Sequence, residues 1–151
     1  MIITEIELFK GIDVDVINEI AGICSEETYS KDTLLCEKGQ KANFMYILEE
    51  GTVDQVIKNG GSIVYKHSDP GLVLGWSAMF ESGVYTASAI CATDIKVFKI
   101  EKDKLNRIFD QHPKAGLIIL KKLGRVVTQR LGNAYRDLLS AGKEKTEASY
   151  G

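Results

Sequence analysis

The chain has 151 residues, of which 44% are hydrophobic and 26% charged, and its formal net charge is -2. This size and composition are typical of one globular domain whose core needs no disulfide or metal. The small net charge argues against a general polyanion-binding role, and no apolar run approaches the roughly 18–20 residues of a membrane span. We therefore expect a protein that does not enter a membrane.

The N-terminal segment MIITEIELFKGIDVD carries acidic residues where a signal peptide would have basic ones. The three cysteines, Cys24, Cys36 and Cys91, match no zinc-binding spacing, and their odd number argues against a full disulfide framework. We interpret them as buried free thiols and expect a cytoplasmic protein.

The first predicted element is a helix, because apolar residues recur at helical spacing from Val14 to Cys24 after a potential N-cap at Asp13. From about residue 27 to residue 100 the pattern changes to about eight short strands separated by turns, including a hairpin whose turn is Asn59-Gly60-Gly61. Many short strands at regular spacing predict a rolled antiparallel sheet. The expected fold class is α+β: an antiparallel β-roll, like a jelly roll or double-stranded β-helix, with short N-terminal helices and a long C-terminal helix.

Helical patterns return after the last strand. The segment EKDKLNRIFDQH predicts a short amphipathic helix that ends before Pro113, and a long helix follows over residues 113–139. The polar residues 140–151 show no apolar periodicity and are expected to be a disordered tail. We therefore expect one domain over residues 1–139.

The long helix carries two apolar stripes. In a heptad register that starts at Leu117, every a and d position as far as Leu138 is apolar or small, which is typical of a coiled coil. A second stripe, formed by Ile119, Leu123 and Val126, covers only the first half of the helix. One stripe can pack on the chain's own domain, so we predict that the other forms a parallel homodimer. In the alternative, the whole helix packs on its own domain.

Four segments, LFKGIDVDVINEIAGI, FMYILEEGTVDQV, PGLVLGWSAMF and YTASAICATDIKVFKIEKDKLNRIF, follow one another in a recognisable order. Together they resemble the cyclic nucleotide-binding domain. This domain is the sensor module of catabolite activator and anaerobic regulator proteins, of protein kinase A regulatory subunits and of cyclic-nucleotide-gated channels. The resemblance spans roughly residues 5–135, and Gly51 stands at one of the family's glycines. It implies a regulatory protein that binds a small ligand.

The resemblance places a phosphate-binding cassette after Gly75, where the family has a short helix whose N–H groups face the cyclic phosphate. Trp76 stands where the family has a glutamate for the ribose 2′-hydroxyl. Tyr85 stands where it has an arginine for the phosphate. No lysine or arginine occurs between Lys66 and Lys96. Loss of this charged partner implies altered specificity or lost cyclic AMP binding.

Other parts of the cassette are retained. Ser77, Thr86 and Ser88 offer hydroxyls, and Thr128 lies on the long helix, where related sensors contact the base with a polar residue. Arg125 is the residue that we expect to replace the missing cation. The predicted ligand-binding residues are thus Gly75, Trp76, Ser77, Tyr85, Thr86, Ser88, Arg125 and Thr128. No cofactor is assigned beyond a cyclic nucleotide or another small ligand.

Two functions from different classes remain open. The chain is either a ligand sensor with an aromatic wall at Trp76 and Tyr85, or a non-binding structural or protein-interaction module whose cavity these two side chains fill. An enzyme is not expected, because His67 is placed on a hairpin surface and His112 at a helix end, and no nucleophile and base are paired. Residues after Leu139 are too few for a helix-turn-helix, so DNA binding of that kind is not expected, and the protein partner is unknown.

Overall fold

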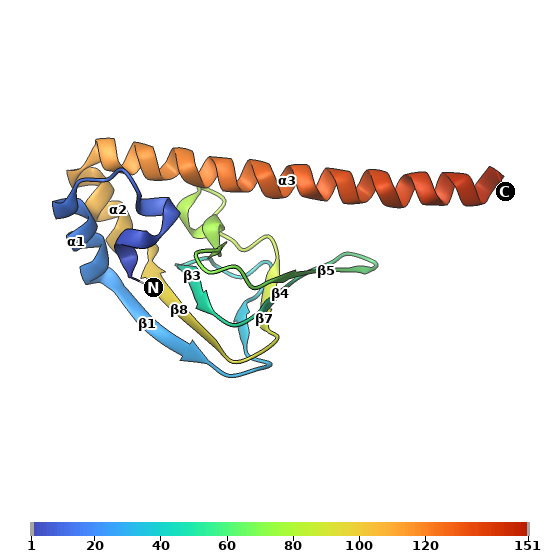
Figure 1. Cartoon of the computed structure of the whole chain (residues 1–151), viewed down its shortest axis with the longest axis horizontal. Coiled ribbons are helices and arrows are strands. Elements are labelled where there is room, and N and C mark those ends of the chain that lie inside the picture. Colours follow the sequence, from blue (N-terminus) through green and yellow to red (C-terminus); the bar gives the residue numbers. More distant parts are fainter. Residues whose placement is uncertain (1, 151) are drawn as a thin grey trace.

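The computed structural model describes residues 2–150, and within α3 it describes side chains as far as residue 141. Two short 3-10 helices, η1 (Ile3–Glu5) and η2 (Glu7–Phe9), precede helix α1 (Val14–Ile23), whose N-cap is Asp13 as predicted. After the strands come α2 (Lys102–Gln111) and α3 (Pro113–Tyr150). Figure 1 shows α1, α2 and the start of α3 gathered at one end of the molecule.

The described chain forms eight strands in two four-stranded antiparallel sheets, which confirms the predicted β-roll. One sheet has the order β1-β8-β3-β6 and the other the order β2-β7-β4-β5. The bounds are β1 Cys24–Tyr29, β2 Leu34–Cys36, β3 Phe44–Glu50, β4 Val53–Lys58, β5 Ser62–His67, β6 Val73–Leu74, β7 Ser88–Cys91 and β8 Ile95–Glu101. The predicted hairpin joins β4 to β5, and Gly60 supplies its positive φ of 71°.

Two apolar clusters hold these layers together. One lies inside the roll between the sheets and includes Leu48, Val53 and Val97, all with 0% exposure. The other joins the helices to the outer face of the first sheet through residues such as Ile47 and Ile100. The central strand β3 is therefore buried on both faces, which suits its nearly continuous apolar sequence.

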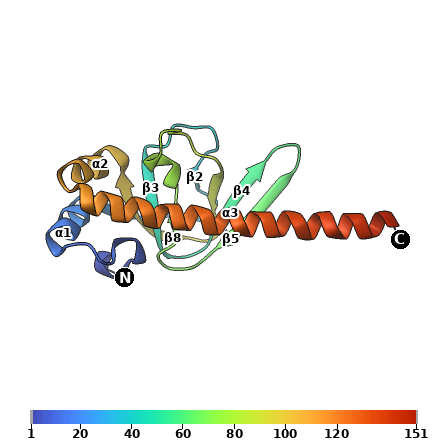
Figure 2. The ribbon, with the colours of Figure 1, turned by 90° about the horizontal axis from the view of Figure 1, so that it is seen from above.

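Helix α3 lies across the helical end of the molecule and then across the roll (Figures 1 and 2). Ile119 and Leu123 are fully buried and Val126 is half-buried, so the second stripe packs against the chain's own domain. Leu117 and Leu131 of the a/d stripe are exposed by 55% and 48%. Leu120 of the same stripe packs against the helical core, so the a/d stripe is only partly exposed and its role in a dimer stays a prediction.

The helix also continues beyond residue 139, where the sequence pattern placed its end, because α3 extends to Tyr150. The predicted disorder of residues 140–151 concerns residues that lie mostly outside the described side chains, and it stays a prediction. Although α3 has the length of a bilayer span, neither it nor another helix in the described part of the chain has the apolar content to cross one.

Candidate functional site

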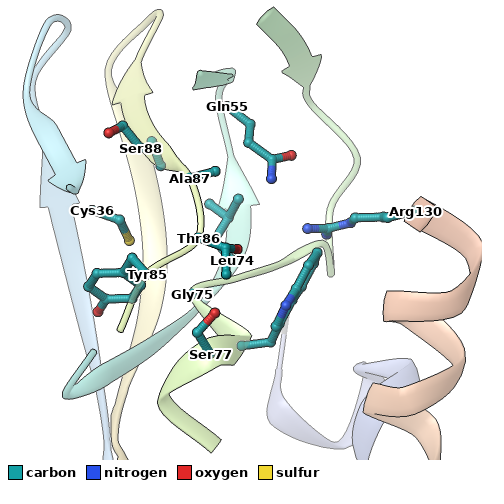
Figure 3. A pocket seen from close by; sticks show the side chains of 12 residues that line it. Cys36, Gln55, Leu74, Gly75, Ser77, Tyr85, Thr86, Ala87, Ser88 and Arg130 are labelled. Atoms are coloured by element: carbon teal, nitrogen blue, oxygen red, sulfur yellow. The ribbon is translucent and has the colours of Figure 1, made fainter. Parts of the chain in front are cut away.

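A pocket lies between the β-roll and α3, at the point where β6 ends. Residues 74–77 and 85–89 form two of its walls, and Cys36, Gln55 and Arg130 complete it. Figure 3 shows these side chains converging from the strands on one side and from α3 on the other. The cavity has a volume of about 30 Å³. That is room for about one water molecule, whereas small-molecule pockets typically measure about 300–1,000 Å³.

The structure brings six of the eight predicted site residues to this pocket: Gly75, Trp76, Ser77, Tyr85, Thr86 and Ser88. The other two, both on α3, lie elsewhere. The exposed Arg125 lines a separate cavity with Glu7 and Lys122, and the Thr128 hydroxyl donates to the Gly124 carbonyl of its own helix at 2.8 Å. The rotation of α3 about its axis turns both away from the pocket.

Gly75 adopts a left-handed conformation, with a φ of 71°. A Cβ atom at this position would lie 2.9 Å from the Phe44 carbonyl oxygen and 3.1 Å from Tyr85 Cε1. Both distances are shorter than ordinary van der Waals contact. The glycine therefore permits close packing of the Tyr85 ring as well as the backbone turn.

Tyr85 lines the pocket but belongs mainly to the core of the roll. Its side chain is 8% exposed, and its hydroxyl donates to the Phe44 carbonyl at 2.8 Å. Burial raises the pKa of Tyr85 to about 12, so the phenol is neutral at physiological pH. A neutral, hydrogen-bonded phenol offers no positive charge to a phosphate. That Tyr85 stands in place of an arginine of the family stays a prediction.

The three hydroxyl residues differ in their availability. Ser77 is 5% exposed, and Ser88 Oγ accepts a hydrogen bond from the Lys38 N–H at 3.0 Å. Thr86 is exposed at the mouth of the pocket. Cys36 is buried beside Tyr85, and burial raises the pKa of this thiol to about 12. The three cysteines are free as predicted, although Cys24 is only partly buried.

One cationic side chain reaches the pocket from α3. The Arg130 guanidinium lies over the ring of Trp76, with Cζ 4.2 Å from the ring centroid, and Nη2 donates to the Val73 carbonyl at 2.5 Å. Burial lowers the pKa of Arg130 to about 10, which leaves the side chain protonated at neutral pH. A guanidinium stacked on an indole is a favourable cation–π arrangement.

Gln55 extends this polar side of the pocket to a histidine. Its Oε1 lies 3.0 Å from His67 Nε2, across the β4–β5 pair. His67 lies on the predicted hairpin, at the end of β5, but it is half-buried rather than fully exposed. Burial, and then the nearby charge of Arg130, lower the pKa of His67.

Arg130 and Gln55 were not among the predicted residues. For Arg130 a signal existed, because it follows Val126 by four positions and thus continues the stripe of Ile119 and Leu123. A cation that continues a buried helical stripe points toward its own domain. Gln55 carried no comparable signal, because its role depends on the pairing of β4 with β7.

The comparisons with known proteins agree with the fold. The family model of the cyclic nucleotide-binding domain matches residues 26–112, which is more than half of the chain. A cAMP-dependent protein kinase regulatory subunit from Candida albicans is 27% identical over 101 residues, which cover 67% of this chain and 21% of that protein. The chain spans about a fifth of the length of the curated relatives it matches.

Solved structures show the same architecture. A cyclic nucleotide-binding domain from Methylobacillus flagellatus has a TM-score of 0.77 at 20% identity, over 91% of this chain and 78% of that one. The regulatory subunit of a cAMP-independent protein kinase A from Trypanosoma brucei has a TM-score of 0.67 at 18% identity, over 82% of this chain and 44% of that one. With its fold, its cassette-like segment and its family match, the chain belongs to the cyclic nucleotide-binding domain family.

Proposed function

We propose that this chain is a ligand-sensing regulatory module, rather than a catalytic one, in which cyclic AMP specificity is altered or lost. The observation that carries the proposal is the pocket itself, where residues 74–77, residues 85–89 and α3 meet. Its lining combines one aromatic face, several neutral hydrogen-bonding groups and one cation, which suits a small polar ligand. A reducing, cytoplasmic compartment fits the three free thiols.

A second candidate function is supported by the size of the cavity. With about 30 Å³ between the roll and α3, no nucleotide fits unless side chains move. Tyr85 already packs against Gly75, and Arg130 covers Trp76. In this alternative the chain is a non-binding structural or protein-interaction module, held in one conformation by its own side chains.

A thermal-shift screen with cyclic AMP, cyclic GMP and cyclic dinucleotides separates the two functions. A ligand at a hundredfold excess over its Kd stabilises the folded state by about 2.7 kcal/mol. This raises the Tm of a domain of this size by roughly 5–10 °C. Ala87→Leu serves as the blocked variant, because its larger side chain fills the small cavity that Ala87 lines. Shifts that persist in Ala87→Leu, or no shift with any compound, would contradict the sensor function.

We further propose that the sensor is a parallel homodimer through the a/d stripe of α3, which would present itself to a protein partner. Leu131 and Leu138 on this stripe are exposed by 48% and 61%, and α3 extends past the sheets in Figure 1. Ala134 lies between them at a d position. Leucines repeated at a positions are typical of a coiled-coil seam.

Two neighbouring leucines provide a matched test of the dimer. Leu138 lies at an a position, whereas Leu139 is more exposed, at 73%, and falls outside the stripe. Multi-angle light scattering should show a dimer for the wild type and for Leu139→Glu, and a monomer for Leu138→Glu. A monomeric wild type at micromolar concentration would refute the dimer and leave the ligand site untouched.

A further inference from the structure

The pocket contains one formal charge. Among the residues that line it, Arg130 is the only side chain that is charged at neutral pH. Its polar neighbours Gln55, Ser77 and Thr86 are neutral, and burial keeps the Cys36 thiol protonated. The interior of the pocket is therefore electropositive, although the chain as a whole is slightly acidic.

This charge has no acidic partner in the described part of the chain. No ion pair within 4.0 Å joins Arg130 to a carboxylate there, although Lys10, Lys66 and Lys96 each form one. Arg130 makes one hydrogen bond, to the Val73 carbonyl, and a guanidinium has five N–H donors. Most of its donor capacity thus remains for another molecule.

The surroundings of Arg130 favour an anion. Removing a cation from water is costly unless a negative charge compensates it, and here the protein supplies only a carbonyl oxygen and an aromatic face. The Trp76 ring lies against the guanidinium, with Cζ 4.2 Å from the ring centroid, and one terminal nitrogen donates to the Val73 carbonyl. Released from that carbonyl, the guanidinium can form the two parallel hydrogen bonds by which arginine recognises carboxylates and phosphates.

We propose that this pocket takes an anionic small molecule whose oxyanion is bound by Arg130 of α3, in place of a cation from the β-roll. The inference rests on the proposed sensor function. It specifies that the ligand is negatively charged and that Arg130 binds the charged group. Because the cavity that Arg130 lines has a volume of only about 30 Å³, the ligand must displace the guanidinium from the Val73 carbonyl or shift α3. Binding thereby acts directly on the helix proposed to form the dimer.

The single tryptophan of the chain gives this inference a local readout, because Trp76 lies under Arg130. We would titrate cyclic AMP, cyclic GMP, cyclic di-GMP and inorganic phosphate at constant ionic strength and follow Trp76 fluorescence. Adenosine is the neutral probe that keeps the base and sugar of cyclic AMP. The variants are Arg130→Gln, Arg130→Lys, which keeps the charge but not the fork, and the control Arg125→Gln.

The expected result is saturable binding of at least one anionic probe to the wild type and to Arg125→Gln. In Arg130→Gln its Kd should rise about 30-fold or more, the effect of removing one partner of a buried charge pair, with Arg130→Lys in between. Equal affinities in Arg130→Gln and the wild type, or adenosine binding as tightly as cyclic AMP, would overturn the inference but not the sensor function. If no probe changes either the fluorescence or the Tm, both fail together.

Discussion

Gly75→Ala tests whether the packing around the pocket is as tight as the structure indicates. An alanine at a φ of 71° costs about 1–2 kcal/mol from the left-handed backbone alone. Its Cβ would also lie 2.9 Å from the Phe44 carbonyl oxygen and 3.1 Å from the Tyr85 ring. Because one of these atoms is backbone, relief requires a shift of β3 or of the tyrosine, and overpacking of this kind costs about 1–3 kcal/mol. We expect a total loss of about 2–5 kcal/mol.

Gly83→Ala is the matched control. Gly83 has a similar φ of 60°, but the nearest atom to an added Cβ is the Glu81 carbonyl oxygen at 3.7 Å, an ordinary contact. It should therefore show the backbone cost of about 1–2 kcal/mol without the clash. The difference between the variants isolates the packing of Tyr85 against Gly75.

Urea denaturation followed by circular dichroism measures both variants, and their midpoints compare directly if the m-values agree with that of the wild type. Equal destabilisation of Gly75→Ala and Gly83→Ala would refute the packing account. It would mean that the atoms around Gly75 move aside at little energetic cost, and that Tyr85 is not tightly packed on this side of the pocket.

Three further predictions concern single side chains of the site. Tyr85→Phe should lower the free energy of unfolding by about 0.5–1.5 kcal/mol through loss of the bond to Phe44, while ligand affinity in the thermal-shift screen stays unchanged. Affinity lost with Tyr85→Phe would instead place its hydroxyl on the ligand. Arg130→Met should raise the free energy of unfolding in anion-free buffer by on the order of 1 kcal/mol, and the Tm with it, because it removes an uncompensated, partly buried cation. A lower Tm of Arg130→Met in scanning calorimetry would show instead that Arg130 stabilises the fold through its own packing. Because the pKa of folded His67 is lowered, its neutral form favours the folded state, and this contribution is lost as pH falls below the unfolded value of about 6.5. His67→Gln should lose less stability than the wild type between pH 7.5 and pH 5.5 in urea denaturation. Parallel pH profiles would contradict the lowered pKa, which burial and Arg130 cause against the opposing charges of Asp69 and Asp54.

Much of the fold could be predicted because its signals are local. Helical spacing located α1, and the Asn59-Gly60-Gly61 turn located the β4–β5 hairpin. The walls of the pocket followed from the segment that contains Gly75 and Tyr85. These features depend on residues that are neighbours in the chain.

The cation was harder to predict because it depends on how α3 lies against the roll. Arg125 and Arg130 look alike in a basic helix, and five positions separate them by roughly 140° around the axis. Only the continuation of the stripe from Val126 distinguishes Arg130, and its contact with Trp76 arises from two segments more than 50 residues apart. Similarly, the size of the cavity follows from side-chain packing that no local pattern encodes.

The most direct test of the sensor function is a nuclear magnetic resonance titration of the Trp76 indole N–H. Because the chain has one tryptophan, this group gives one side-chain signal that needs no further assignment. Its position under Arg130 reports occupancy of the pocket itself. Titration with an anionic cyclic nucleotide that raises the Tm should move the signal saturably in the wild type and much less in Arg130→Gln. A compound that raises the Tm but leaves the Trp76 signal in place would put the ligand elsewhere and contradict this assignment of the site.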